Sequence, residues 1–278
     1  MGVQVSVVRG VPPGYVRLDV PQGDVVVHQK LADAARTALE AGTLYAWAAA
    51  HPDRRQMQGR LPVYAAPLPH EGPTVVVRHA QHGGMLAPLL RDLFLPPTRA
   101  PRELATALLL ARSGVPTPPV AGYAIYRAGP ILRRADVMTV HLPGEDLGAM
   151  LRGAMSDADR ARLVTPVAAL LGALTQAGAW HPDLNVKNIL LVADDAGELH
   201  PAVLDIDRVH FVPPGDPNVR EANFQRLARS MDKWRALHGV GFTDDERRAI
   251  HDRLLQDEAV EATHRALALD AYMPTDLT

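Results

Sequence analysis

A polar stretch and a later acidic pair hold the side chains of this sequence that are best suited to chemistry. The stretch reads His181-Pro182-Asp183-Leu184-Asn185-Val186-Lys187-Asn188, and the acidic pair is Asp205 and Asp207. Two short apolar runs between them, separated by the turn-forming Asp194-Asp195-Ala196-Gly197, predict a β-hairpin. Because a hairpin brings its outer ends together, we expect the polar stretch to lie beside the acidic pair, so that three carboxylates converge.

Carboxylates that lie this close repel one another unless a cation neutralises them. The available donors are all oxygen, which favours Mg²⁺ or Mn²⁺. We therefore expect Mg²⁺ on Asn188 and Asp205, with Asp207 as a further ligand. A hard cation beside a free carboxylate is the working part of a kinase-type phosphoryl-transfer site that uses ATP. In that site Asp183 would orient the acceptor hydroxyl and accept its proton.

These residues also have plain structural interpretations. A single aspartate after a strand is usually a turn former that bonds its own backbone, and His-x-Asp alone is common. Only the joint pattern of apolar helix, polar loop, hairpin and acid favours catalysis. We expect His181 to be structural, bonding the backbone near Asp205, and Lys187 to be solvated.

The N-terminal half should supply the contacts to the ATP phosphates. Arg78 ends an apolar run, and Glu103 follows on the next predicted helix, so an ion pair of these two residues could hold the phosphates. Alternatively, Glu103 is an acid in a first helical turn, favoured there by the helix dipole. Gly59 is the candidate glycine of a phosphate-covering loop.

Two histidines follow Arg78, at His79 and His82, ahead of Gly83-Gly84. His-x-x-His could bind a metal, but no third ligand is evident. We expect exposed histidines beside a substrate site instead, with glycines that allow close backbone approach.

The surrounding pattern predicts a β-rich first half and a mainly helical second half. In the first half, alternation and turn residues predict these strands and helices: strands at Val3–Val8 and Val25–Val27, a helix over Leu31–Ala50, a hairpin of Leu61–Ala66 with Thr74–Arg78, a helix from Arg99 to Gly114, and strands at Val120–Tyr126 and Arg133–Leu142. Pro143-Gly144 marks a hinge, after which we expect a helix from Thr165 to Gly178, the hairpin of Ile189–Val192 with Ala202–Leu204, and further helices.

Composition excludes several classes of protein. The 278 residues are 47% hydrophobic, which suffices for a sizeable core, and 29 basic residues nearly balance 31 acidic ones. Overall charge therefore gives no reason to expect a nucleic-acid partner. The absence of cysteine excludes disulfides and fits a reducing cytoplasm. No signal peptide or bilayer-spanning run is evident.

The sequence resembles the bacterial lipopolysaccharide kinase family, in particular the 3-deoxy-D-manno-octulosonic acid (Kdo) kinases. The resemblance covers about Gly59 to Lys233 and is carried by these motifs: His181-x-Asp183-Leu184-Asn185-x-x-Asn188-Ile189-Leu190, Leu204-Asp205-x-Asp207-Arg208, Arg78-His79 with Gly83-Gly84, Gly114-x-Pro116-x-Pro118, and Asn223-x-x-Arg226-Leu227-x-Arg229-Ser230-x-x-Lys233. The sequence departs from the family at Ala80-Gln81-His82, where an aromatic and basic residues are usual.

The resemblance implies an α+β, two-lobed protein-kinase-like fold, with a small β-rich N-lobe and N-terminal extension in residues 1–142 and a helical C-lobe in residues 143–278. It implies transfer of the ATP γ-phosphate, with Mg²⁺, to a hydroxyl of Kdo on a lipid A precursor. The enzyme would be cytoplasmic and contact the inner face of the bacterial inner membrane peripherally.

Two alternatives stay open. A small-molecule kinase of the aminoglycoside or choline type shares the Asp and Asn pattern, although it lacks the Asn223 to Lys233 motif. A non-catalytic pseudokinase could bind nucleotide or glycolipid and regulate a partner. Protein substrates are disfavoured, because the chain has no Ala-Pro-Glu and no long activation segment after Asp207.

Overall fold

The computed structural model describes residues 10–21, 23–57, 62–81, 92–153 and 155–256. These residues fall into two compact units. Among the described residues, the sheet unit comprises those up to Ala105 together with Pro119–His141, and the helical unit comprises Thr106–Pro118 together with those from Leu142 to Gln256. The lobe boundary expected between residues 142 and 143 stays a prediction, as does the role of the N-terminal extension.

The sheet unit is built on one antiparallel sheet of seven strands in the order β1-β2-β6-β7-β5-β4-β3. Its strands are β1 (Tyr15–Val20), β2 (Gly23–His28), β3 (Arg55–Met57), β4 (Val63–Pro67), β5 (Thr74–His79), β6 (Val120–Ala128) and β7 (Leu132–Val140). The predicted hairpin is confirmed as β4 and β5, with Tyr64 opposite Val77. The predicted strand at Val3–Val8 lies outside the described residues, and β1 was not predicted.

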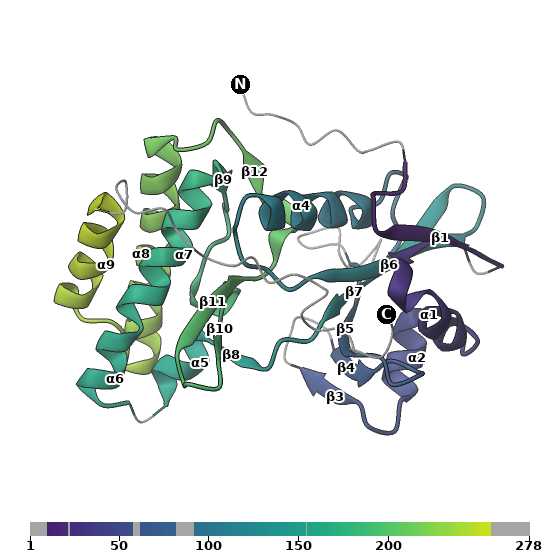
Figure 1. The fold of residues 1–278 in the computed structure, drawn as a ribbon, viewed down its shortest axis with the longest axis horizontal. Helices are drawn as coiled ribbons and strands as arrows, with labels where there is room; N and C mark the ends of the chain where they lie inside the picture. Colours follow the sequence, from purple (N-terminus) through teal and green to yellow (C-terminus); the bar gives the residue numbers. More distant parts are fainter. Residues whose placement is uncertain (1–9, 22, 58–61, 82–91, 154, 257–278) are drawn as a thin grey trace. The chain divides into compact units, whose positions relative to one another are not determined.

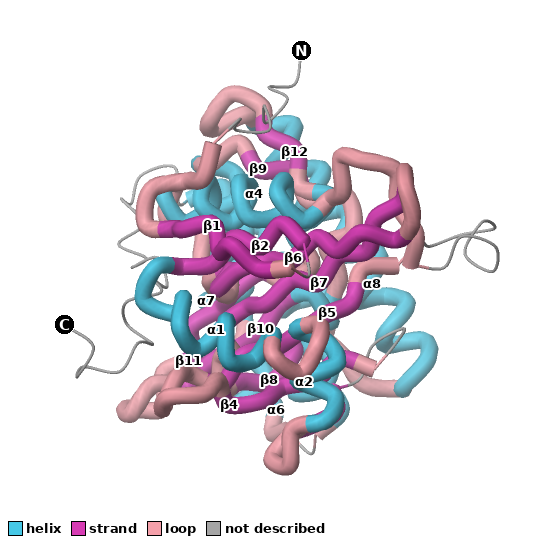
Figure 2. The backbone as a smooth tube through the Cα atoms, turned by 90° about the vertical axis from the view of Figure 1, so that its right-hand side faces the viewer, coloured by secondary structure: helices cyan, strands magenta, loops and turns pink. Residues whose placement is uncertain are grey.

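Helices α1 (Ala32–Leu39) and α2 (Leu44–Ala50) cover one face of this sheet, after the 3₁₀ turn η1 (Gln29–Leu31) (Figure 2). Their small alanines allow close packing on the buried valines of the strands. The expected single helix over Leu31–Ala50 is wrong, because the chain breaks at Gly42, which has a φ of +113°. Thr43 then caps α2 by accepting a hydrogen bond from Ala46 N at 3.0 Å.

Helix α4 (Ala100–Arg112) follows the fifth strand in sequence, as predicted, and carries Glu103 in its first turn. Gly114 ends it with a φ of +74°, a conformation that glycine adopts without strain.

The helical unit contains two small sheets and five helices among the residues that the structure describes (Figure 1). In chain order its elements are β8 (Gly144–Asp146), α5 (Leu147–Arg152), α6 (Asp157–Arg162), α7 (Val164–Gln176), β9 (Ala179–Trp180), η2 (Val186–Asn188), β10 (Ile189–Ala193), β11 (Leu199–Val203), η3 (Ile206–Arg208), β12 (His210–Phe211), α8 (Pro217–His238) and α9 (Asp244–Gln256).

Helix α7 is the centre of this unit, since nine of its thirteen residues are buried and it contacts both α8 and α9. It is followed by Gly178, which has a φ of +63° and lies so close to the chain at Val212 that a Cβ atom would sit 2.2 Å from the Val212 carbonyl oxygen. Only glycine fits there, so the chain turns sharply into β9 and the polar stretch.

The predicted catalytic hairpin is confirmed as β10 and β11, with Ile189 opposite Val203. Gly144 of the expected hinge is the first residue of β8, which pairs with the free edge of β10, and its role as a hinge stays a prediction. The short β9–β12 pair was also not predicted, because two-residue strands carry no periodic signal.

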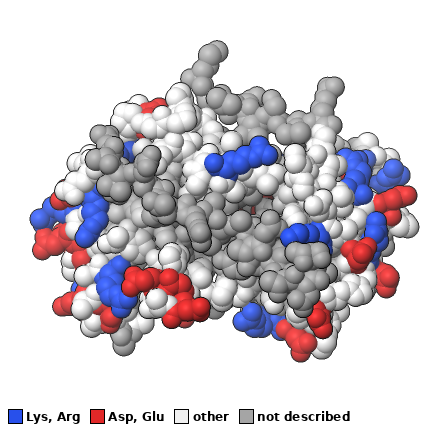
Figure 3. Space-filling view, viewed as in Figure 1, with Lys and Arg blue, Asp and Glu red and all other residues white. Residues whose placement is uncertain are grey.

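The face of the molecule drawn in Figure 3 carries both basic and acidic side chains. No helix within the described ranges is long and apolar enough to cross a membrane.

Candidate active site

The polar loop between β9 and β10 is held in place by a buried histidine. The His181 side chain is fully buried, and its Nε2 donates to the Leu204 carbonyl oxygen at 3.0 Å. The His181 backbone N–H donates to Oδ1 of buried Asn223 at 2.9 Å, and Asn223 Nδ2 donates to the Ala179 carbonyl oxygen. The structural role expected for His181 is therefore confirmed. Asn223 on α8 is its partner, which the sequence reasoning did not identify.

Two asparagines fix the backbone of Asp183. Asn188 Nδ2 and Asn185 Nδ2 both donate to the Asp183 carbonyl oxygen, at 2.9 and 2.8 Å. Asn185 also caps η2 by accepting from Lys187 N through its Oδ1. The loop is thus closed on itself by its own amides, and the Asp183 side chain is left half-exposed for other contacts.

The Asp183 carboxylate lies between two arginines. Arg226 Nη2 on α8 is 3.0 Å from Oδ1, and Arg208 Nη1 in η3 is 3.6 Å from Oδ2. Arg226 also donates from Nε to the Pro182 carbonyl oxygen at 2.8 Å. Both arginines occur in motifs of the sequence, but nothing in their spacing indicates that they would meet at Asp183.

Asp205 lies at the open end of the β10–β11 hairpin. Leu204 N donates to the Asn188 carbonyl oxygen at 2.9 Å, which extends the hairpin ladder by one bond and brings the two outer segments together. Asp205 then adopts a left-handed conformation with a φ of +56°, unusual for a residue with a side chain. Such backbone strain is concentrated at functional sites.

The oxygen donors at this end of the hairpin suit a magnesium ion. Asn188 uses its amide nitrogen for the bond to Asp183, so its amide oxygen is the atom left for a metal. The Asp205 side chain is exposed and has no hydrogen-bond or ion-pair partner among the described residues. A carboxylate and an amide oxygen are hard ligands of the kind that Mg²⁺ prefers.

The expected convergence of three carboxylates is wrong. In the part of the chain that the structure describes, no three acidic or histidine side chains come together as a metal-binding group. The reason is that the Asp183 carboxylate pairs with two arginines, and that Asp207 lies within the 3₁₀ turn η3, which begins directly after Asp205. Asn188, Asp205 and Asp207 each stay predicted ligands.

The sheet unit contains the expected ion pair of Arg78 and Glu103. Arg78 Nη2 on β5 bonds directly to Glu103 Oε1 in the first turn of α4. The Glu103 side chain is only 7% exposed, whereas that of Arg78 is 38% exposed, so the guanidinium is the accessible partner. The contact of these two residues with phosphates stays a prediction. Gly59 lies outside the described residues.

His79 is part of a partly buried network and is not the exposed histidine that we expected. Its Nδ1 is 2.6 Å from Oδ1 of Asp136, and its Nε2 is 3.0 Å from Oδ2 of Asp92. Arg134 Nε also donates to Asp92 Oδ2 at 2.6 Å. The hydrogen bond to Asp136, opposed by burial and assisted by Asp92, raises the pKa of His79 above its usual value. His82, Gly83 and Gly84 lie outside the described residues.

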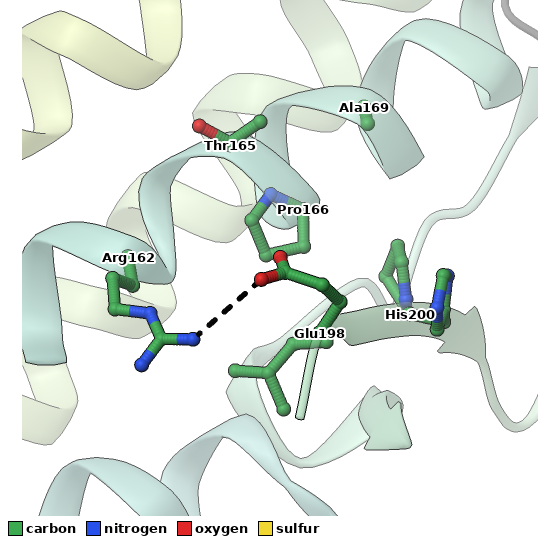
Figure 4. Close-up of a pocket in the computed structure, with 8 residues that line it drawn as sticks. Arg162, Thr165, Pro166, Ala169, Glu198 and His200 are labelled. Atoms are coloured by element: carbon green, nitrogen blue, oxygen red, sulfur yellow. Dashed lines mark ion pairs between the residues drawn. The ribbon is translucent and has the colours of Figure 1, made fainter. Parts of the chain in front are cut away.

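The helical unit also has a groove of about 350 Å³ that none of the predicted site residues lines (Figure 4). Its walls come from α6, α7 and β11, and its lining residues are Arg162, Thr165, Pro166, Ala169, Glu198, Leu199, His200 and Pro201. The one ion pair across it, Arg162 with Glu198, spans 3.9 Å between two exposed side chains and contributes little stability. Chemistry is therefore assigned to the polar loop and not to this groove.

Comparison with known proteins gives consistent matches. The sequence profile of the lipopolysaccharide kinase (Kdo/WaaP) family matches residues 66–252. A 3-deoxy-D-manno-octulosonic acid kinase of Vibrio vulnificus strain YJ016 is 25% identical over 183 residues, which cover 64% of this chain and 73% of that protein. One from Photobacterium damsela subsp. piscicida is 29% identical over 179 residues, 62% of this chain and 70% of that protein.

A solved structure described as WaaP in complex with acyl carrier protein is similar in fold. It has a TM-score of 0.53 and 17% sequence identity, and the match covers 84% of this chain and 88% of that one. This likeness confirms the predicted α+β, kinase-like fold.

Proposed function

Because the chain belongs to the lipopolysaccharide kinase (Kdo/WaaP) family, we propose that it transfers the γ-phosphate of ATP to a hydroxyl of a Kdo sugar on a lipid A precursor. The coarser statement, that it is a phosphotransferase of lipopolysaccharide biosynthesis, follows from the family. The named acceptor is our proposal, and it is supported by the similarity to Kdo kinases at 25–29% identity.

The observation that carries the proposal is the arrangement of the polar loop. Asp183 has a rigidly held backbone and a half-exposed carboxylate, which suits a group that orients the acceptor hydroxyl and accepts its proton. Asn188 is bonded to the same residue, so the proposed metal ligand and the proposed base are fixed relative to each other. Positioning of this kind supplies most of the catalysis in phosphoryl transfer.

Asn188 and Asp205 would hold Mg²⁺, with Asp207 as a further ligand. When bound, the ion neutralises charge on the ATP phosphates, which the enzyme needs because like charges otherwise repel the acceptor oxygen. In the sheet unit, the Arg78 guanidinium would bind phosphate oxygens while buried Glu103 keeps it in place. We further propose that the protein acts in the cytoplasm and contacts the inner face of the inner membrane peripherally, where such a glycolipid acceptor would be found.

The experiment that tests this function measures transfer of labelled phosphate from ATP, with Mg²⁺, to a Kdo-bearing lipid A precursor. Free Kdo, an aminoglycoside and a generic protein serve as comparators. We expect transfer to the glycolipid and not to the aminoglycoside or the protein.

Other outcomes would contradict the proposal in different ways. Transfer to the aminoglycoside would indicate a small-molecule kinase with a similar loop. Tight ATP binding without transfer to any acceptor would indicate a non-catalytic nucleotide-binding protein or a different sugar.

A further inference from the structure

The Asp183 carboxylate is outnumbered by positive charge. Arg226 reaches it from α8 and Arg208 reaches it from η3, so that two guanidiniums face one carboxylate. Neither arginine has another acidic partner within the described ranges. Elsewhere in the same unit the balance is the reverse, since the single Arg160 pairs with both Asp157 and Glu246. At these contacts, therefore, two positive charges are matched by one negative charge.

This excess is accessible to a ligand. The side chains of Arg208, Arg226 and Asp183 are 56%, 33% and 40% exposed. The basic character continues along α8, because Arg229 and Lys233 follow Arg226 at spacings of three and four residues and are exposed along the same edge of the helix.

The contacts of Asp183 also conflict with its proposed role. The two arginines occupy the carboxylate oxygens that an acceptor hydroxyl must reach. An acceptor hydroxyl must therefore share these oxygens with the guanidiniums or displace one of them. Because these ion pairs are partly exposed, exchanging the Asp183 carboxylate for another anion costs little stability.

We propose that Arg208 and Arg226 form a binding site for an anionic group of the acceptor, a carboxylate or a phosphate, and that Asp183 occupies this site when no acceptor is bound. Binding of the acceptor then transfers the guanidiniums to its anion and frees Asp183 for the neighbouring hydroxyl. The forked donors of arginine match both carboxylate and phosphate oxygens.

The two arginines have different parts in this exchange. Arg226 is anchored through Nε to the Pro182 carbonyl oxygen, so its Nη atoms keep their direction when Asp183 leaves. Arg208 is the more exposed and its contact with Asp183 is the longer, at 3.6 Å against 3.0 Å. We assign Arg226 as the side chain that keeps its position when the anion binds, and Arg208 as the side chain that moves to the anion.

The test is a binding cycle between the arginine and the anion. Acceptor affinity is measured by calorimetry, with Mg²⁺ and a non-hydrolysable ATP analogue present, for the wild-type protein and for Arg208→Ala. The acceptors are a Kdo-bearing lipid A precursor, the same molecule with its carboxylate methyl-esterified, and the same molecule with its phosphates removed. Arg248→Ala on α9, which removes an exposed arginine paired with Asp245, is the matched control.

We expect Arg208→Ala to weaken binding of the full acceptor by about tenfold, the order expected for one charge-assisted contact. Removing the recognised anion from the acceptor should weaken wild-type binding similarly and change the binding of Arg208→Ala little, because the two changes remove the same contact. The ester arm and the dephosphorylated arm identify which anion it is. Arg226→Lys, checked for an unchanged melting temperature, should weaken binding less than Arg208→Ala does.

The inference is overturned if Arg208→Ala binds the acceptor as tightly as the wild type does, or if the wild type binds ATP but no acceptor. It is also overturned if each anion removal lowers acceptor affinity by the same factor in Arg208→Ala as in the wild type. The inference rests on the proposed function, which supplies the acceptor used here, but the anion site and the proposed function can fail separately. Coupled binding without phosphate transfer would contradict the proposed function and leave the anion site standing. Transfer without coupling would do the opposite.

Discussion

Each unit of the molecule holds an aspartate bound by basic side chains, and the two aspartates are built in opposite ways. Asp136 in the sheet unit is fully buried, and its two oxygens accept from Tyr45 N at 2.9 Å and pair with His79 at 2.6 Å. Asp183 in the helical unit is 40% exposed, and arginines from two separate elements contact it at 3.0 and 3.6 Å. The first carboxylate is bound on both oxygens inside the core, and the second is accessible from solvent.

This difference separates a carboxylate that stabilises the fold from one that is suited to catalysis. A buried charge that loses its partner is strongly unfavourable, so Asp136 cannot exchange partners and instead ties α2 to β7 and β5. An exposed ion pair contributes little stability, so Asp183 can change partners at little cost. We expect substitutions in the first network to change stability and substitutions in the second to change activity.

The largest effect should come from Asp183→Ala. Loss of a positioned base should lower turnover by about a hundredfold to ten-thousandfold. The free energy of unfolding should change by no more than about 1 kcal/mol, because the ion pairs lost are partly exposed. Steady-state kinetics and urea unfolding of the same preparation measure both quantities. Near-wild-type turnover would remove Asp183 from the mechanism.

Asp136→Ala should have the reverse effect, with a large change in the free energy of unfolding. It leaves Tyr45 N and His79 without their partner in the core, and we expect a loss of about 3 kcal/mol in unfolding free energy. Asp53→Ala, at an exposed aspartate of the same unit, is the control and should change stability by less than about 0.5 kcal/mol. If the two variants unfold alike in urea, the contrast between buried and exposed carboxylates fails.

Asp205→Asn tests the metal site without disturbing the left-handed backbone, which asparagine tolerates. Loss of the ligand charge should weaken Mg²⁺-dependent nucleotide binding by about tenfold. Asp207→Asn tests the further predicted ligand in the same way, and titration of both variants with nucleotide at several Mg²⁺ concentrations compares them. An unchanged Mg²⁺ dependence in Asp205→Asn, with a weakened one in Asp207→Asn, would move the ligand role to Asp207.

The smallest effect concerns pH. The hydrogen bond to Asp136 raises the pKa of His79 in the folded protein, against the opposing effect of burial. Its stabilising contribution is therefore complete below the unfolded pKa of about 6.5 and is lost as the pH rises through the folded value. The free energy of unfolding, obtained from urea curves measured from pH 6 to pH 9, should fall more in the wild type than in His79→Gln, by on the order of 1 kcal/mol. Parallel curves would show that His79 does not titrate in this range.

Much of the fold could be predicted from local patterns. The β10–β11 hairpin, α4, α7 and the β4–β5 hairpin were predicted because each has a periodic apolar pattern and a glycine or turn at its end. The kinase-like fold was predicted from the motifs around Asp183 and Asp205. Short strands such as β9 and β12, and the break at Gly42, carry too little pattern to be seen in the sequence.

The sequence predicted which residues belong to the candidate site better than it predicted the contacts between them. The Arg78–Glu103 pair and the bond from His181 to Leu204 were both expected. The arginines at Asp183 and the burial of His79 were not. Arg226 follows Asp183 by 43 positions, and such a contact depends on how α8 packs against the loop, which no local spacing encodes.

The sequence by itself determined the kinds of group available for chemistry and the elements that carry them. Residue type fixes charge, hydrogen-bonding capacity and local backbone preference, and these are properties of a few neighbouring positions. Tertiary structure alone decided which of those groups meet, because burial and ion pairing depend on segments far apart in the chain. That is why Asp136 became a buried partner of His79, while Asp183 stayed exposed between two arginines.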